Sequence, residues 1–129
     1  MTKETRPLSP HLSVYRWQVT NTLSIIHRLS GVALYLGSLL LPIWIAAIAY
    51  SGSFGQVILS LISHPISKFP LIGLTFAFFY HSLNGIRHLL WDIGKGFETR
   101  ELKISGAIVV ILSLILTALF WLCIFSESN

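Results

Sequence analysis

The chain has 129 residues, of which 53% are hydrophobic and only 11% are charged. This composition excludes an ordinary water-soluble domain and leaves room for only a few membrane spans. The formal charge of +4 comes from basic residues scattered at the ends of apolar segments, which excludes a nucleic-acid-binding patch. The single cysteine, Cys123, excludes a disulfide framework, a thiolate zinc site and an iron–sulfur cluster held by this chain alone. We therefore expect a small integral membrane protein.

The N-terminal segment, residues 1–20, is polar and has no apolar run ahead of a small-residue cleavage site, so it does not have the pattern of a signal peptide. We expect it to stay on the protein and to lie along the inner membrane surface. Asn21 can cap a first transmembrane helix over residues 21–50. Pro42 should kink that helix, because proline leaves the carbonyl four residues earlier without its usual partner.

Further apolar segments follow the first helix. Between residues 51 and 68, apolar side chains recur at helical spacing, which predicts a short helix in the outer interface that ends at Pro65. The predicted second and third spans cover residues 69–91 and 104–125, with a charged inner hairpin over 92–103 between them and an outer tail over 126–129. The sequence therefore predicts an all-α membrane protein with three transmembrane helices.

The basic residues predict the orientation. Lysine and arginine gather in the N-terminal segment and in the 92–103 hairpin, whereas the first connection carries Lys68 alone and the tail carries none. By the positive-inside rule, the N-terminus and the hairpin face the cytoplasm or the equivalent side of an organelle, and the C-terminus faces outside. The start of the first span and the end of the second span then lie on the same, inner side.

The second span ends in a polar stretch, His81-Ser-Leu-Asn-Gly-Ile-Arg-His-Leu-Leu-Trp-Asp-Ile-Gly94. Ionisable groups at membrane depth are costly and indicate a functional site. Helical spacing places several of these residues on one face: His81, Asn84, Gly85 and His88. A stripe of small residues, Gly73, Ala77 and Gly85, runs along the same face around His81. Such a groove would let a haem lie against the helix while the His81 imidazole reaches its iron. Alternatively, His81 hydrogen-bonds a neighbouring helix or faces a watery crevice.

A second polar group opens the first span. Ser24, His27 and Arg28 lie on one helical face at the basic end of the helix. A cation, an imidazole and a hydroxyl there can bind haem propionates or a quinone carbonyl. The alternative for Arg28 is a topology marker whose side chain snorkels to the lipid headgroups.

The depths of these residues are compatible with one haem site. Propionates directed toward the inner surface would lie at the level of a group of cationic and imidazole side chains: His27, Arg28, Arg87 and His88. His81 and His88 lie on the same helical face, so they cannot bind opposite faces of one haem. His27 is an internal candidate for the second ligand, but it lies near the surface, and a histidine from a partner chain is geometrically easier.

Other enzyme classes find no support in the sequence. No glycine-rich turn follows a strand, which argues against a flavin or nicotinamide site, and no nucleophile–base pair or carboxylate pair stands in a pocket-like context. The chain alone should not oxidise a soluble substrate. It reads instead as a conduit or anchor for electrons that other subunits produce.

The sequence resembles the cytochrome b anchor subunits of succinate dehydrogenase, respiratory complex II. The resemblance rests on Arg6-Pro-Leu, then Ser24-Ile-Ile-His-Arg-Leu-Ser30-Gly31, and then the His81–Gly94 stretch, in the family's order and spacing. It implies that His81 is an axial ligand of haem b, and that three helices form half of a bundle made with a second small anchor subunit that supplies the other ligand. Ser24 and Arg28 match the family's quinone-site serine and arginine, and His27, Arg28 and His88 match positions in or near the haem site.

The resemblance further implies the partners and the membrane. These are a flavoprotein subunit, an iron–sulfur subunit, the second anchor, quinone and lipid, in a bacterial inner membrane with the N-terminus inside, or in a mitochondrial inner membrane if the chain is organelle-encoded. Three alternatives remain at this point. They are a haem-binding subunit of fumarate reductase, a haem-free anchor or assembly factor, and a transporter, which the absence of an internal repeat disfavours.

Overall fold

The computed structural model describes residues 17–50 and 52–127, and every regular element in that part of the chain is a helix, as predicted. The expected surface segment over 1–20 lies almost wholly outside the described residues. The elements run in this order: α1 (Val19–Ser38), α2 (Leu40–Ala49), α3 (Ser53–Ser63), the short 3-10 helix η2 (Pro65–Ser67), α4 (Lys68–Asp92) and α5 (Thr99–Glu127).

The predicted first span appears as two consecutive helices, α1 and α2, that meet at Leu39. The break follows Ser38, whose carbonyl lies four residues before Pro42 and therefore lacks the hydrogen bond that proline cannot donate. Leu39 keeps helical dihedral angles, φ −69° and ψ −20°, so the chain bends there without leaving the helical path. Taken together, Val19–Ala49 is long and apolar enough to cross a membrane.

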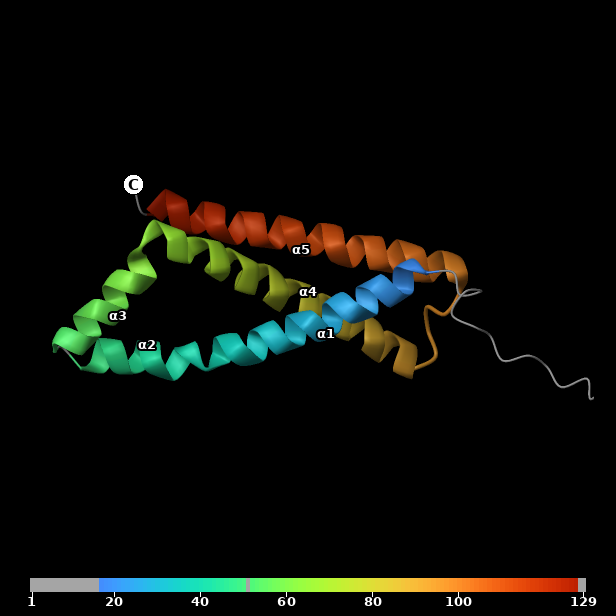
Figure 1. Ribbon diagram of the computed structural model, residues 1–129. Coiled ribbons are helices and arrows are strands. Elements are labelled where there is room, and N and C mark those ends of the chain that lie inside the picture. Colours follow the sequence, from blue (N-terminus) through green and yellow to red (C-terminus); the bar gives the residue numbers. More distant parts are fainter. Residues whose placement is uncertain (1–16, 51, 128–129) are drawn as a thin grey trace, which may run out of the picture.

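The connection after α2 contains the short helix expected there, α3, which packs against α2 (Figure 1). Gly55 permits this packing, because a Cβ at that position would collide with the backbone oxygens of Ala47 and Tyr50. The chain then turns by 64° into η2 and α4. His64 accepts a hydrogen bond from the Ile66 backbone nitrogen, 3.3 Å away, and so caps this turn.

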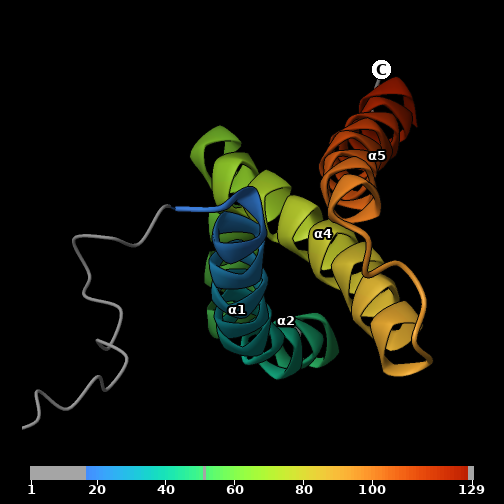
Figure 2. The ribbon, with the colours of Figure 1, turned by 90° about the vertical axis from the view of Figure 1, so that its right-hand side faces the viewer.

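The helix α4 occupies the centre of the molecule, with α1 on one side and α5 on the other (Figure 2). Its 25 residues reach about 37 Å at about 1.5 Å per residue. The helix α5, like Val19–Ala49, is long and apolar enough to cross a membrane. The helix α4 is so when it is taken together with the bent α3 segment. Residues 17–50 and 52–127 therefore contain two candidate spans, or three if the bent pair is one span.

Few apolar side chains are buried inside this chain. The core consists of Leu23, Tyr80 and Val109, one from each of the three long helices, and Tyr80 donates a hydrogen bond to the Leu23 carbonyl at 2.8 Å. Most large apolar side chains instead point outward. Lipid or other protein helices can cover such a surface, which is why a membrane protein tolerates it.

The start of α1, the end of α4 and the start of α5 gather at one end of the molecule, and the α2–α3 corner and the C-terminus lie toward the other end (Figure 1). Two glycines with left-handed backbone, Gly94 (φ 77°) and Gly96 (φ 83°), form the turn between α4 and α5. The helix α5 begins at Thr99, whereas the predicted third span begins at residue 104. The last residues of the charged hairpin, 99–103, are therefore part of the helix. Glu101 suits that first turn, where the helix dipole favours an acidic side chain.

Candidate functional site

The two polar groups predicted from the sequence meet between α1 and α4. The His27 and His81 rings stack nearly in parallel, with centroids 4.1 Å apart and planes 10° apart. The centroid of the His88 ring lies 5.2 Å from that of the His27 ring, and the two ring planes are tilted by 41°. Two helices that are far apart in the sequence therefore place three imidazoles together.

The Nδ1 atom of His81 has two neighbours on α1. The Ser30 Oγ lies 3.1 Å away and the His27 backbone oxygen 3.2 Å away. Ser30 is buried, with 6% of its surface exposed. No hydrogen bond within the described residues engages the Nε2 atom of His81, so its lone pair can serve a metal. Sequence reasoning missed Ser30, although its place three residues after His27 puts it on the same helical face.

Gly31 makes the close approach of the two helices possible. A Cβ at this position would come within 3.0 Å of the His81 Cε1 atom, which is tighter than ordinary van der Waals contact. A residue with a Cβ would require the imidazole to shift by a few tenths of an ångström. A glycine at position 31 therefore suits this close packing of α1 on His81.

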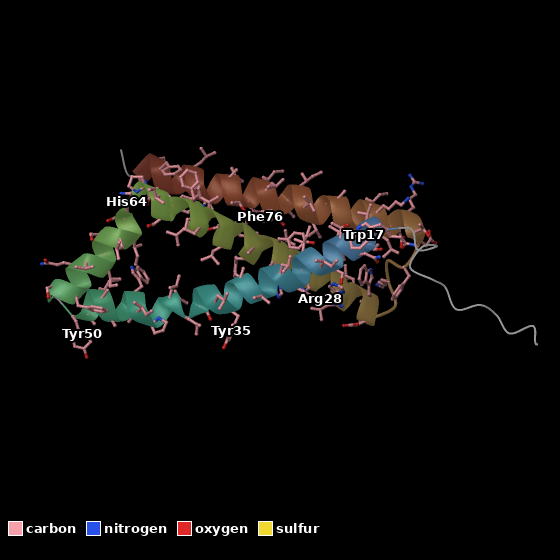
Figure 3. The ribbon with its side chains drawn as sticks, in the orientation of Figure 1. Trp17, Arg28, Tyr35, Tyr50, His64 and Phe76 are labelled. Atoms are coloured by element: carbon pink, nitrogen blue, oxygen red, sulfur yellow. The ribbon has the colours of Figure 1, made fainter. Side chains whose placement is uncertain are left out.

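Ser24 and Arg28 lie on α1 beside His27. Ser24 is half-buried. Arg28 is exposed on the surface of α1, near the end of the molecule where α4 ends (Figure 3). The guanidinium is thus available to a ligand or to lipid headgroups, and the two sequence-based interpretations both fit this placement. The stack of His27 on His81 brings this part of α1 next to the histidine face of α4.

Arg87 does not join the histidine cluster. It is 4% exposed, and its guanidinium donates to Ser105 Oγ and to the Leu102 carbonyl of α5, each at 2.8 Å. The same group lies over the Trp91 ring, 4.2 Å from its centroid. Its hydrogen bonds join α4 to α5, which gives Arg87 a structural role, and the expectation that it serves haem propionates stays a prediction.

Asn84 was also expected to share the His81 face. Its side chain is fully buried, and its Oδ1 accepts a hydrogen bond from Arg87 of the same helix at 3.4 Å. Asn84 lies about 60° around the helix from His81 on one side, and Gly85 lies about 40° from it on the other. The polar stretch therefore divides into a histidine face and an Asn84–Arg87 face.

The histidine face has room for a flat group. A Cβ at Gly73 or Gly85 would find no atom within 4 Å, although Ala77 between them is buried in the bundle. The surface beside Gly85 is open in this chain, and the half-buried His81 lies one helical turn away with its Nε2 in no hydrogen bond within the described residues. The residues present therefore fit a haem.

The His27 and His81 rings do not stand on opposite sides of an open space. They stack face to face with centroids 4.1 Å apart, which is not the arrangement of two imidazoles that bind opposite faces of one haem. Among the described residues, no group of three histidine, cysteine or acidic side chains is arranged to hold a bare metal ion. His64 lies at the far end of α4 (Figure 3). That His81 is a haem ligand, with the opposite ligand on another chain, stays a prediction.

Comparison with known proteins supports the resemblance found in the sequence. The family described as succinate dehydrogenase/fumarate reductase transmembrane subunit matches residues 2–120. The chain is 44% identical over 116 residues to the succinate dehydrogenase cytochrome b556 subunit of Rickettsia felis, which covers 90% of each chain. It is 43% identical over 116 residues to the Rickettsia prowazekii protein of that name, again over 90% of each chain.

The chain is also similar to a mitochondrial protein. The chain is 42% identical over 121 residues to the succinate dehydrogenase cytochrome b560 subunit of Mus musculus, covering 88% of this chain and 69% of the mouse protein. The match to the family extends over nearly the whole sequence and includes both polar groups that meet between α1 and α4. The chain therefore belongs to the family of succinate dehydrogenase/fumarate reductase transmembrane subunits.

Proposed function

We propose that this chain is the haem b-binding membrane anchor of a succinate:quinone oxidoreductase and that it forms part of the quinone-reduction site. The observation that carries the proposal is the His81 geometry. Its Nδ1 is engaged by α1 while its Nε2 remains available beside an open glycine position. The names of the relatives, which are cytochrome b subunits of succinate dehydrogenase, support the same cofactor.

His81 would bind the haem iron through Nε2, and a histidine of a second small anchor subunit would supply the opposite ligand. The haem, when bound, provides a one-electron store within the membrane. His27 stacks on His81, and the His88 ring lies 5.2 Å from the His27 ring. Together with the cation of Arg28, these imidazoles would hold the propionates. The three helices would then form half of a bundle that the second anchor completes, and the outward apolar side chains supply the surface for it.

Ser24 and Arg28 would bind quinone at the inner surface. Arg28 carries a permanent positive charge and can stabilise negative charge that develops on a quinone oxygen during reduction. Ser24, one turn before it, can donate a hydrogen bond to a quinone carbonyl. The exposed position of Arg28 is compatible with this role, because the substrate must enter from the membrane and the iron–sulfur subunit must approach from the inner side.

The partners that we propose are the other subunits of a succinate:quinone oxidoreductase. A flavoprotein and an iron–sulfur subunit would oxidise succinate on the inner face and pass electrons toward the α1–α4 site. We place the N-terminus and the 92–103 hairpin on that face because they carry most of the basic residues. The membrane would be the inner membrane of a bacterium, as the rickettsial relatives suggest.

Deleting the chain from its natural host tests the proposal. We expect succinate oxidation with a soluble artificial acceptor to persist and to move into the soluble fraction, while succinate-dependent quinone reduction is lost. Re-expressing the chain should restore both the membrane association and the quinone reduction. If the succinate-oxidising subunits stay on the membrane and reduce quinone at the normal rate without this chain, the proposal is wrong.

A further inference from the structure

The buried hydroxyl of Ser30 lies at the centre of a small hydrogen-bonded group. Ser30 Oγ donates to the His27 carbonyl at 2.7 Å and lies 3.1 Å from His81 Nδ1. The same carbonyl oxygen is 3.2 Å from His81 Nδ1. One hydroxyl, one carbonyl and one ring nitrogen therefore form a triangle between α1 and α4.

The positions of the protons in this triangle follow from the donors available. A serine hydroxyl has one proton, and the short contact with the His27 carbonyl uses it. The Ser30 oxygen then offers only lone pairs to His81, and the carbonyl is an acceptor as well. Two acceptors facing Nδ1 require that this nitrogen carry a proton. If Nδ1 were unprotonated, its lone pair would face the carbonyl oxygen, which is unfavourable.

A protonated Nδ1 leaves the lone pair of the neutral imidazole on Nε2. Metal-bound histidines commonly donate their other N–H to an acceptor that fixes the tautomer and the ring orientation and raises the basicity of the ligand. The ring of His81 is further restrained by the parallel His27 ring on one side and by Gly31, which lies close to Cε1.

We propose that Ser30 is a positioning residue for the haem ligand: with the His27 carbonyl it holds His81 in the Nδ1–H form and so sets the strength of the bond from Nε2 to iron. This inference rests on the proposed function, because it takes His81 as the ligand. A more basic imidazole stabilises oxidised iron relative to reduced iron, so the contact with Ser30 lowers the reduction potential of the haem.

The test compares Ser30→Ala with Ser30→Thr and Ser38→Ala in the purified complex with all its subunits. Ser38 is a matched control, because its Oγ also donates to a carbonyl three residues back, that of Tyr35, at 2.7 Å, but it is exposed and lies two turns from Ser30 along α1. We expect Ser30→Ala to raise the haem reduction potential and to speed haem transfer to apomyoglobin about tenfold, in line with the loss of an outer-shell partner. Ser30→Thr, which keeps the hydroxyl, should stay near wild type, as should Ser38→Ala.

A wild-type potential and haem-transfer rate in Ser30→Ala would overturn the inference. If that variant does not assemble, Ser30→Cys replaces it, since a thiol of similar size forms only weak hydrogen bonds and should shift the potential in the same direction. No shift in Ser30→Cys would again overturn the inference. A low-spin haem that survives His81→Ala would instead contradict the proposed function, so the two failures are distinguishable.

Discussion

Replacing Arg28 with alanine is expected to lower succinate-dependent quinone reduction by about 100-fold while succinate oxidation with an artificial acceptor stays near wild type. Removing one preorganised donor from a site of developing negative charge typically costs two to three orders of magnitude in rate. Artificial acceptors take their electrons from the water-soluble subunits, which Arg28 does not touch in this account. Arg28→Lys keeps the charge but not the planar fork and should give an intermediate rate. The measurement is the ratio of the two activities in membranes with equal amounts of assembled complex.

Arg100 provides the matched control for Arg28. It is an exposed arginine in the first turn of α5, and the start of α5 lies at the same end of the molecule as the start of α1 (Figure 1). Arg100→Ala should leave both activities unchanged. An equal loss of both activities in Arg28→Ala would show that Arg28 serves assembly, and an unchanged ratio would return it to the role of a topology marker.

Replacing Arg87 with alanine is expected to destabilise the protein, because this buried side chain joins the two helices that pack most extensively. Its removal takes away the hydrogen bonds to Ser105 Oγ and to the Leu102 carbonyl, which keeps a longer hydrogen bond from Ser105 Oγ at 3.4 Å, and it removes a cation from the Trp91 ring. Interhelical hydrogen bonds in membranes contribute about 0.6–2 kcal/mol each, and a cation over a ring about 1 kcal/mol. The total loss should be on the order of 2–3 kcal/mol, seen as earlier thermal dissociation of the detergent-purified complex.

Two companion variants show whether the Arg87 contacts carry this effect. Ser105→Ala removes one of them and should produce a smaller loss of thermal stability, while Lys95→Ala, in the exposed turn, should produce none. An Arg87→Ala complex that dissociates at the wild-type temperature would contradict the structural role. A normal stability with a lower haem content would instead return Arg87 to the haem propionates.

The helices could be predicted from the sequence because each is a long apolar run with polar ends. Pro42 marked the bend between α1 and α2, since proline disturbs a helix at a fixed distance before it. The sequence predicted that the polar groups of the first and second spans lie on one side of the membrane and can share a site, but it left His27 nearer the surface than His81, and the stacking of the two rings was not predicted. The beginning of α5 at Thr99 was missed because the helix continues through charged residues beyond its apolar run.

The partners of individual polar side chains could not be predicted from spacing. Asn84 and His81 differ by three residues, which places them close enough on a helix to share a face or to lie on either side of an interface. Only the angle at which α1 and α5 cross α4 decides between these outcomes, and Arg87 is the side chain that forms hydrogen bonds to α5. Ser30 was overlooked for the same reason, since its significance depends on how closely α1 and α4 approach at Gly31.

Whether His81 binds the haem iron can be read directly from the reduced-minus-oxidised visible spectrum of the assembled complex. The spectrum is compared for wild type, His81→Ala and His64→Ala. His64 is the control, because its ring caps a turn at the far end of α4. We predict a low-spin b-type signal in wild type and in His64→Ala that is lost or becomes high-spin in His81→Ala with the complex still assembled. An unchanged low-spin signal in assembled His81→Ala would contradict the account.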